Sequence, residues 1–294
     1  MISELSILIP TYNSKCISLV EKLAQLCSCI PELKYEIIVA DDGSRDQGAI
    51  ISNLLINELE HCHYIRRKEN VGRAKIRNFL ADQAQYEWLL FLDSDVKIVS
   101  DDFIRNYLNP QADVVSGRTK IFPSHDKKNL RSKYETKWAT CHSADKLNEN
   151  PYEHFVTANF ICRSKVFDVC RFDERFSQYG YEDTAFGISL KENGFTLQHI
   201  YNPVGFDKFD SNSSYLQKVE VSLHTLYRFR DELRGYSQVQ KVVEYAAGHH
   251  ILWLLRLWHC LFGRLIRYVL EKYYPSLLLF NIYKVGYYAA IKFD

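Results

Sequence analysis

The sequence predicts an α/β protein with a mostly parallel sheet flanked by helices, followed by a helical C-terminal extension. Through the first 120 residues, short runs of β-branched and aliphatic residues alternate with stretches of helical apolar spacing. This alternation is typical of parallel strands joined by right-handed crossover helices. After about Tyr215 the strand pattern ends, and large apolar residues recur at helical intervals.

Composition and charge limit the classes of function. The 294 residues are 47% hydrophobic and 25% charged, which suits one large domain or two modest ones. The net charge of +1 provides no positive field for nucleic acid, so we expect no nucleic-acid partner. The eight cysteines include no C-x-x-C pair, and Met1–Glu4 lack the pattern of a signal peptide. We therefore expect reduced thiols and a cytoplasmic location.

Five strands are predicted in the first 120 residues. Their apolar runs cover Leu5–Pro10, Glu36–Ala40, His63–Arg66, Trp88–Leu92 and Val114–Thr119. Helical spacing between them covers Ile17–Cys29, Ile50–Leu59, Gly72–Gln83 and Asp102–Leu108. The unbroken apolar run Trp88–Leu92 indicates a strand that is buried on both faces.

The following segment is less regular. Charged and polar residues fill Lys120–Tyr152, which we interpret as a partly helical excursion that covers a substrate. Beyond it, strands are predicted at Phe155–Cys162 and Phe195–Tyr201, and helices at Lys165–Cys170 and Thr184–Asn193.

Two carboxylates directly follow the strand Trp88–Leu92. Asp93 and Asp95 are separated only by Ser94. Ligands of open α/β sheets bind at the carboxyl ends of the strands, and an Asp-x-Asp pair there can hold Mg²⁺ or Mn²⁺ that bridges phosphate oxygens. Aspartates also turn the chain after strands, so the pair alone leaves both interpretations open.

Similar polar clusters occur at three other turns. They are Thr11-Tyr12-Asn13, Asp41-Asp42 and Glu182-Asp183. Turn chemistry explains each cluster alone. Together they predict several carboxylates at one edge of the sheet, where they would repel one another without a cation.

These segments, in this order and at these intervals, resemble the glycosyltransferase family 2 enzymes of GT-A fold. The likeness covers roughly residues 4–205 and is carried by Ser6–Asn13, Glu36–Asp46, Asn70–Asn78, Leu92–Asp95 and Gly180–Asp183. The resemblance implies a catalytic domain over residues 1–212, with a nucleotide-sugar half at 1–119 and an acceptor half at 120–212. A helical region over residues 213–294 would follow it.

The resemblance implies a role for each matching residue at the nucleotide site. Tyr12 would stack on the base, and Asp42 would accept a hydrogen bond from the base. Arg77 would reach the base or a phosphate, unless it is an ordinary helix-surface arginine, and Asp93 would face the ribose. The implied nucleotide-binding set is Pro10, Thr11, Tyr12, Asn13, Asp42, Asn70, Gly72, Arg77, Asp93 and Ser94.

The resemblance also implies the residues of the chemical step. Asp95 would ligate the divalent cation, Mn²⁺ or Mg²⁺, that stabilises the leaving diphosphate. Asp183 would be the general base for the acceptor hydroxyl, and Glu182 would position the acceptor or the sugar. A helix start favours Asp183 as the anion, so partial burial would have to restore its basicity. Without the other motifs, the same pair would be an ordinary acidic helix start.

The sequence departs from the family pattern at two points. Many relatives carry a histidine after an Asn-Pro-Val segment, whereas residues 202–207 read Asn-Pro-Val-Gly-Phe-Asp. Phe206 cannot ligate a metal, so either Asp207 replaces the histidine or Asp95, phosphate and water hold the cation. His199 is expected to pack or to face solvent. The Gln-x-x-Arg-Trp signature of processive synthases is absent, which predicts one sugar per encounter.

The C-terminal region is aromatic and basic. Arg256, Arg264 and Arg267 fall on one side of a helical projection, with apolar residues elsewhere around it. Such a helix suits a membrane surface, but it equally suits a helical hairpin packed on the sheet domain, so both interpretations stay open.

The sequence thus predicts an inverting, metal-dependent transferase. It would move a sugar from a nucleotide-sugar donor, preferably UDP-linked, to a hydroxyl of a glycan or lipid-linked acceptor in surface polysaccharide biosynthesis. We expect it in the cytoplasm, at the inner face of the cell membrane if the C-terminal helices bind there. A pyrophosphorylase is disfavoured because Pro10–Lys15 contain no glycine for a triphosphate loop. The alternative is a non-catalytic, membrane-associated partner of another transferase, an interpretation supported by Phe206 alone.

Overall fold

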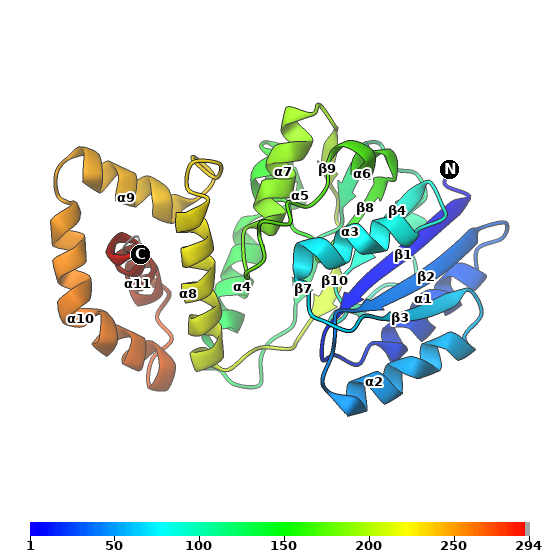
Figure 1. Ribbon diagram of the computed structural model, residues 1–294, viewed down its shortest axis with the longest axis horizontal. Helices are drawn as coiled ribbons and strands as arrows, with labels where there is room; N and C mark the ends of the chain where they lie inside the picture. The colour runs from blue at the N-terminus through cyan, green and yellow to red at the C-terminus, as the bar shows by residue number, and fades with distance from the viewer. Residues whose placement is uncertain (292–294) are drawn as a thin grey trace. The chain divides into compact units, whose positions relative to one another are not determined.

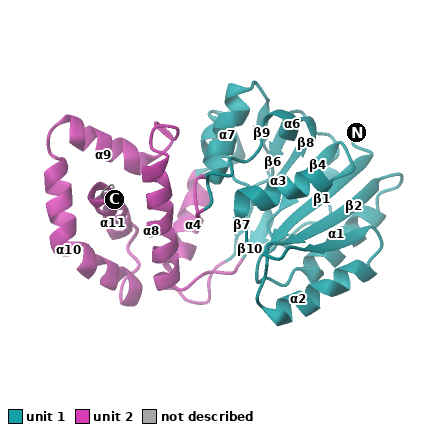
Figure 2. Ribbon diagram, viewed as in Figure 1, with its two compact units in different colours: residues 1–122, 142–177, 182–206 teal, residues 123–141, 178–181, 207–294 magenta. Residues whose placement is uncertain are grey.

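The computed structural model describes residues 1–291, which form two compact units (Figure 2). An α/β unit comprises residues 1–122, 142–177 and 182–206. A helical unit comprises residues 123–141, residues 178–181 and the chain from residue 207 onward. The functional division into a donor half at 1–119, an acceptor half at 120–212 and a helical region at 213–294 stays a prediction.

The α/β unit is built on a seven-stranded sheet in the order β3-β2-β1-β4-β8-β6-β9 (Figure 1). Its strands are β1 (Glu4–Thr11), β2 (Lys34–Asp41), β3 (Cys62–Arg66), β4 (Trp88–Leu92), β6 (Val114–Ser116), β8 (Asn159–Arg163) and β9 (Leu197–His199). Strands β1 to β4 run parallel, and β8 runs antiparallel to β4 and β6. A smaller sheet contains β5 (Lys97–Ile98), β10 (Val204–Phe206) and β7 (Thr119–Ile121). The predicted mostly parallel α/β sheet is confirmed.

Helices cover both faces of the large sheet. They are α1 (Ile17–Ser28), α2 (Gln47–Leu54), α3 (Arg73–Gln83), α5 (Ala144–Asn148), α6 (Lys165–Val169) and α7 (Glu182–Glu192). Single 3₁₀ turns add η1 (Leu55–Glu58), η2 (Arg105–Tyr107) and η3 (Pro151–His154).

Alternation along the strands divides the core between the two faces. Ile7 and Ile9 of β1 pack in the cluster that contains α1, whereas Leu8 packs in the cluster that contains α3 and α7. All five residues of β4 are buried, as its apolar run predicts. Burying one such side chain stabilises the fold by about 1.5–3 kcal/mol, so β4 holds the turn that follows it in a fixed place.

Some elements differ from the sequence prediction. Asp102–Leu108 is not an α-helix but a turn followed by η2. The segment is short and Pro110 follows it, so helix nucleation is unfavourable there. The strand expected at Val114–Thr119 is split between β6 and β7, with Arg118 at a φ of 72°. Strands β5 and β10 were not predicted, because two or three residues give no periodic signal.

The helical unit confirms the expected helical C-terminal region. Its helices are α4 (Leu130–Cys141), α8 (Asn212–Arg228), α9 (Gln238–Gly248), α10 (Leu252–Lys272) and α11 (Leu277–Ala290). Helix α11 packs against the other four, and Figure 2 shows it within the arc of α8, α9 and α10. Within residues 1–291, no helix combines the length and the apolarity needed to cross a bilayer.

Candidate active site

The sheet topology gathers several strand ends beside β1. Strand β1 pairs in parallel with β2 on one side and with β4 on the other, so the winding of the chain reverses at β1. Ligands of open α/β sheets bind at such a switch point, outside the carboxyl ends of the strands. Thr11, Asp41 and Leu92 end β1, β2 and β4, so the turns after these residues lie at this edge.

The turns after β1 and β2 are joined by hydrogen bonds. The Asn13 N–H donates to Ser44 Oγ at 2.7 Å. In return, Asn13 Oδ1 accepts from the backbone N–H groups of Arg45 (2.8 Å) and Asp46 (3.0 Å). Asn13 has a φ of 50°, a conformation that asparagine tolerates better than most residues. The two turns therefore form one rim, in which the Tyr12 side chain stays 46% exposed and available for stacking.

Asp42 connects this rim to the loop before α3. Its Oδ1 accepts from Val71 N at 2.9 Å, and its Oδ2 accepts from Gly72 N at 3.0 Å. Burial raises the pKa of the Asp42 carboxyl, and these two hydrogen bonds oppose the increase. An ionised carboxylate has about four lone-pair sites, so Asp42 can still accept a further hydrogen bond from a ligand.

Arg77 and Asp93 form a largely buried ion pair. Arg77 lies on α3 with 1% of its side chain exposed, and its Nη2 donates to Asp93 Oδ1 at 2.6 Å. Arg77 Nη1 also donates to the Arg73 carbonyl at 3.3 Å. The Nε–H of Arg77 is buried and has no hydrogen-bond partner within the described structure. The alternative that Arg77 is an ordinary surface arginine is wrong.

Arg73 joins two of the predicted acidic clusters. Its guanidinium lies 3.3 Å from Glu182 Oε1 and 3.8 Å from Asp93 Oδ2. Glu182 is 3% exposed at the first position of α7, whereas the Arg73 side chain is 47% exposed. One cation thus bridges the turn after β4 and the start of α7, which lie far apart in the sequence.

Asp183 follows Glu182 on α7 and has the electrostatic setting of a general base. Its Oδ1 accepts from the Thr184 N–H at 2.7 Å. Burial raises the pKa of the Asp183 carboxyl to about 6, and the Glu182 charge adds to the increase. The charges of Arg73 and Arg77 act in the opposite direction. A carboxylate with a pKa near 6 can accept a proton at neutral pH more readily than an ordinary aspartate.

Few side chains at this edge of the sheet could ligate a divalent cation. Asp95 lies partly buried in the turn after β4, while the nearby Asp93 carboxylate is already bonded to Arg77. No cluster of three or more His, Cys, Asp or Glu side chains suited to a metal occurs among residues 1–291. A cation such as Mg²⁺ keeps several waters and takes further ligands from substrate phosphates, so a single carboxylate such as Asp95 is compatible with it. The role of Asp95 as a metal ligand stays a prediction.

Phe206 and His199 are both buried in strands of the α/β unit, and Asp207 as a replacement metal ligand stays a prediction. Phe206 is buried in β10. His199 is 2% exposed in β9, and its Nε2 is 2.8 Å from the Pro151 carbonyl oxygen. Burial lowers the pKa of His199. His199 therefore packs in the α/β unit, which is one of the two outcomes expected for it.

The remaining predicted residues lie at the same edge by their positions in the chain. Pro10 precedes the last residue of β1, Asn70 lies in the loop before α3, and Ser94 separates the two aspartates after β4. Gly72 is the N-cap of α3 with a φ of 90°. Hydrogen bonds and ion pairs join Arg77, Asp93 and Glu182 into one network through Arg73, and Asp42 bonds to Gly72, the residue that precedes Arg73.

Arg73 in this network and Ser44 in the rim are residues to which the sequence analysis gave no role. Arg73 could have been found as the residue one helical turn before Arg77, since positions i and i+4 share a helix face. Ser44 carries no sequence signal beyond a place in a turn.

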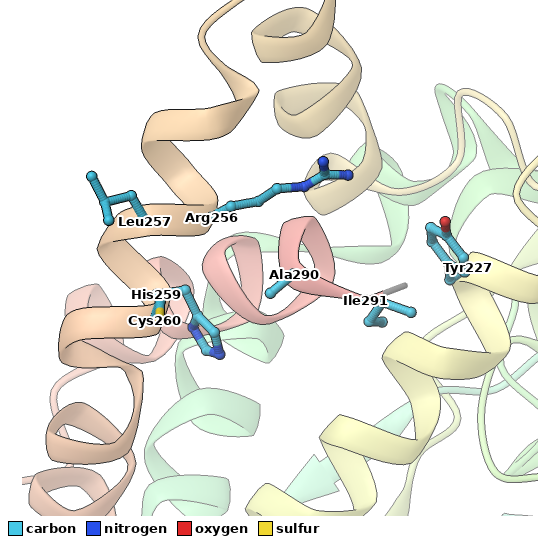
Figure 3. Close-up of a pocket in the computed structure, with 7 residues that line it drawn as sticks. All are labelled: Tyr227, Arg256, Leu257, His259, Cys260, Ala290 and Ile291. Atoms are coloured by element: carbon cyan, nitrogen blue, oxygen red, sulfur yellow. The ribbon is translucent and has the colours of Figure 1, made fainter. Parts of the chain in front are cut away.

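The helical unit contains a separate cavity of about 680 Å³ (Figure 3). It is lined by Tyr227, Arg256, Leu257, His259, Cys260, Ala290 and Ile291. None of the predicted nucleotide, metal or catalytic residues lines this cavity. The candidate active site is the β1–β4 edge.

The fold is that of the GT-A glycosyltransferases. The family model described as glycosyl transferase family 2 matches residues 6–171, and this chain belongs to that family.

Two relatives illustrate the similarity. The chain is 28% identical over 243 residues to a chondroitin synthase of Escherichia coli, a match that covers 70% of this chain and 35% of that protein. It is 27% identical over 273 residues to the uncharacterized glycosyltransferase YfnE of Bacillus subtilis, covering 72% of this chain and 69% of YfnE. The matched segment is thus about a third of the chondroitin synthase.

Solved structures share the fold at lower identity. The mannosyltransferase PcManGT of Pyrobaculum calidifontis, in complex with GDP-Man and Mn²⁺, has a TM-score of 0.57 at 15% identity, covering 97% of this chain and 85% of that one. The Staphylococcus aureus TarS structure in complex with UDP has a TM-score of 0.50 at 21% identity, covering 76% of this chain and 65% of that one. At these identities the likeness concerns the fold.

Proposed function

We propose that this protein is an inverting, metal-dependent glycosyltransferase. It takes a sugar from a nucleotide-sugar donor, UDP-linked by preference, and transfers it to a hydroxyl of a glycan or lipid-linked acceptor in surface polysaccharide biosynthesis. The observation that carries the proposal is the contact network at the switch point. There Arg73 and Arg77 meet Asp93 and Glu182 next to Asp183.

The donor nucleotide occupies the rim formed by the turns after β1 and β2. The exposed Tyr12 ring stacks on the base beside Thr11, and Asp42 accepts a hydrogen bond from it. Asp93 faces the ribose while it stays paired with Arg77. The fixed hydrogen bonds of Asn13 and Asp42 hold these groups in place before the donor binds, which lowers the entropic cost of binding.

The leaving diphosphate needs positive charge around it. Asp95 holds the divalent cation, which when bound stabilises the charge that develops on the leaving nucleoside diphosphate. Arg73 is the half-exposed cation of the network, so its guanidinium can exchange a carboxylate for a phosphate oxygen.

Asp183 removes the proton from the acceptor hydroxyl. The oxygen of that hydroxyl then attacks the anomeric carbon from the face opposite the diphosphate, so the anomeric configuration inverts. Glu182 positions the acceptor or the sugar and keeps Asp183 basic through its negative charge. One sugar is added per encounter.

The relatives and structural neighbours support the donor and acceptor classes. One neighbour holds UDP, another TarS structure holds UDP-GlcNAc, and PcManGT holds GDP-Man with Mn²⁺. Relatives include a poly(ribitol-phosphate) β-glucosyltransferase of Bacillus spizizenii, which shares 35% identity over 122 residues. By this analogy we place the enzyme in the cytoplasm at the inner face of the cell membrane, where a lipid-linked acceptor is available.

A panel of nucleotide sugars tests the proposal. The purified protein is incubated with Mn²⁺ and each donor, and mass spectrometry follows donor loss and nucleoside diphosphate release. We expect one donor to be consumed, the reaction to stop with EDTA, and Asp183→Asn to lose at least about 100-fold in rate. Absence of turnover and of nucleotide binding across the panel would contradict the proposal.

Phe206 favours one other candidate, a non-catalytic partner of another transferase. It is buried in β10 at the position where many relatives carry a metal-binding histidine. If that candidate holds, Asp95→Asn and Asp183→Asn will match the parent chain in a complementation assay. Loss of function in both variants supports the enzyme.

A further inference from the structure

We propose that the outer face of α10 binds the surface of an anionic phospholipid membrane. The outer face is defined by Leu254, Leu257, Leu261, Leu265 and Tyr268. The proposal deepens the membrane location given above by naming the surface and the lipid chemistry. Its test needs no enzymatic activity, so its failure is distinguishable from failure of the proposed reaction.

The outer face is a continuous apolar stripe exposed to solvent. Its five residues are spaced by three or four positions, so they lie on one side of the helix. Their exposed fractions lie between 46% and 64%. Gly263, Ile266 and Leu270 are buried on the opposite side. The helix is therefore amphipathic, with a second apolar side that no described part of the chain covers.

Exposed apolar residues are concentrated in this part of the chain. Among residues 1–291, 14 of the 22 exposed large hydrophobic side chains lie between Val242 and Ile282. Besides the outer face, they include Trp253 at 60%, Tyr273 at 61% and Leu278 at 70%. A patch of this density marks an interaction surface rather than the scattered apolar residues of an ordinary surface.

The structure also changes the interpretation of the three arginines on this helix. Arg256 Nε donates to the Ala289 carbonyl at 2.8 Å, and Figure 3 shows its side chain extending over α11, on the other side of the helix from Leu257. Arg267 Nε donates to Glu220 Oε1 at 2.8 Å. These two arginines therefore hold α10 against the rest of the helical unit. Arg264 is exposed beside the outer face.

The charge and the aromatic residues of α10 favour a lipid surface, rather than a second protein chain, as the binding partner of the outer face. From Tyr245 to Leu270 the sequence contains three arginines and no Asp or Glu. The one carboxylate of α10, Glu271, is 17% exposed and already pairs with Arg267 and Lys272, so in a symmetric dimer it would be a poor partner for Arg264, whereas lipid phosphate would pair with it. Trp and Tyr beside leucines are typical of the membrane interface, where the ring is buried and its polar group meets headgroups. Helix α10 thus lies in the interface rather than across the bilayer.

Vesicle co-sedimentation of the full chain tests the proposal. We use phosphatidylcholine vesicles with and without 30% phosphatidylglycerol and expect stronger binding to the anionic ones. The double substitution Leu261→Asp and Leu265→Asp is expected to lower the partition coefficient at least about tenfold, because two apolar side chains no longer enter the lipid. Arg264→Gln is expected to lower binding about fivefold on anionic vesicles only.

The chain offers a matched control on α2. Ile51 and Leu54 are 65% and 50% exposed, close to the 64% and 58% of Leu261 and Leu265. Ile51→Asp with Leu54→Asp is expected to leave vesicle binding unchanged. A wild-type protein that stays in the supernatant with both vesicle types overturns the proposal, whatever the variants do. A wild-type dimer in sedimentation velocity that the Leu261→Asp and Leu265→Asp pair dissociates also overturns it.

Discussion

Arg77 illustrates how one side chain serves the fold and the site at once. A guanidinium that is 1% exposed must have a carboxylate partner, because an unpaired buried charge is costly. Asp93 is that partner, so the pair fixes the turn after β4 against α3. In the proposed function the same pair presents Asp93 to the donor ribose, while the Arg77 Nε–H is buried without a hydrogen-bond partner in the described structure.

Replacing Arg77 by methionine is expected to lower the free energy of unfolding by about 2–4 kcal/mol, because Asp93 keeps a partly buried charge without its donor. Urea denaturation measures the change. Arg175 is the matched control, since it also pairs at 2.6 Å, with Asp173, but at the surface. Arg175→Met is expected to change stability by less than about 1 kcal/mol. Equal effects of the two substitutions would contradict the assigned role of burial.

Asp183 gives the protein a specific dependence of stability on pH. Its folded-state pKa is about 6, above the ordinary value of 3.8, so the folded state retains the proton longer than the unfolded chain as the pH rises. Stability contributed by the protonated group is therefore present below about pH 4 and lost as the pH approaches 6. The ionised Asp183 destabilises the fold at neutral pH.

We expect Asp183→Asn to be more stable than the parent at pH 8, by roughly 1–3 kcal/mol, and similar to it at pH 4. Thermal unfolding of both proteins across this range measures the difference. A variant that is equally stable at pH 8, or less stable there, would show that burial does not raise the Asp183 pKa.

The sequence singled out Asp93, Asp95 and Asp183 as candidates because motifs and strand ends mark them. It did not identify Arg73, since an arginine at a helix start is ordinary and its two partners are 20 and 109 positions away. That pairing depends on how α3, β4 and α7 meet in the folded unit. Long-range side-chain contacts of this kind carry no local sequence signal.

At the scale of elements, the turn after β2 depends on glycine. Gly43 has a φ of 74°, and a Cβ there would lie 2.5 Å from the Glu69 backbone carbon. This close approach holds the turn against the loop that precedes α3. Gly194 has a similar φ of 73° after α7, with nothing within 4 Å of the Cβ position.

Alanine substitutions at these two glycines distinguish the cost of backbone strain from the cost of a steric clash. Gly194→Ala is expected to cost about 1 kcal/mol from backbone strain alone. Gly43→Ala is expected to cost about 2–4 kcal/mol and to weaken nucleotide binding, because the rim must also move. Chemical denaturation and nucleotide titration of both variants check this. Similar losses at both positions would contradict the tight packing of this turn.

Element prediction succeeded where a run was long and periodic. Trp88–Leu92 is β4 residue for residue, and the helix predicted at Gly72–Gln83 is α3. It failed at η2 and at β10, where three residues are too few for a period and the pairing partners lie elsewhere in the chain. The sequence also did not show which side of α10 is exposed. The helical projection grouped three arginines on one side, and two of them bond to other helices of the helical unit.

At the scale of the whole molecule, the nucleotide site belongs to the α/β unit and the outer face of α10 belongs to the helical unit. We therefore expect nucleotide affinity and membrane binding to respond to different substitutions. Leu261→Asp with Leu265→Asp is expected to change UDP affinity by less than about twofold, because the effects of substitutions that share no partners are independent. Calorimetry checks this, and a large loss of affinity would show that the two units are coupled.

The measurement that most directly tests the assigned nucleotide site is calorimetric titration of UDP, with Mn²⁺ present, into the parent and two tyrosine variants. Tyr12 at the rim and Tyr245 on α9 are both exposed, at 46% and 64%. We predict one UDP per chain, an affinity about tenfold weaker for Tyr12→Ala through loss of stacking, and no change for Tyr245→Ala. Equal affinities for the two variants, or no binding to the parent, would contradict a nucleotide site at the β1–β4 edge.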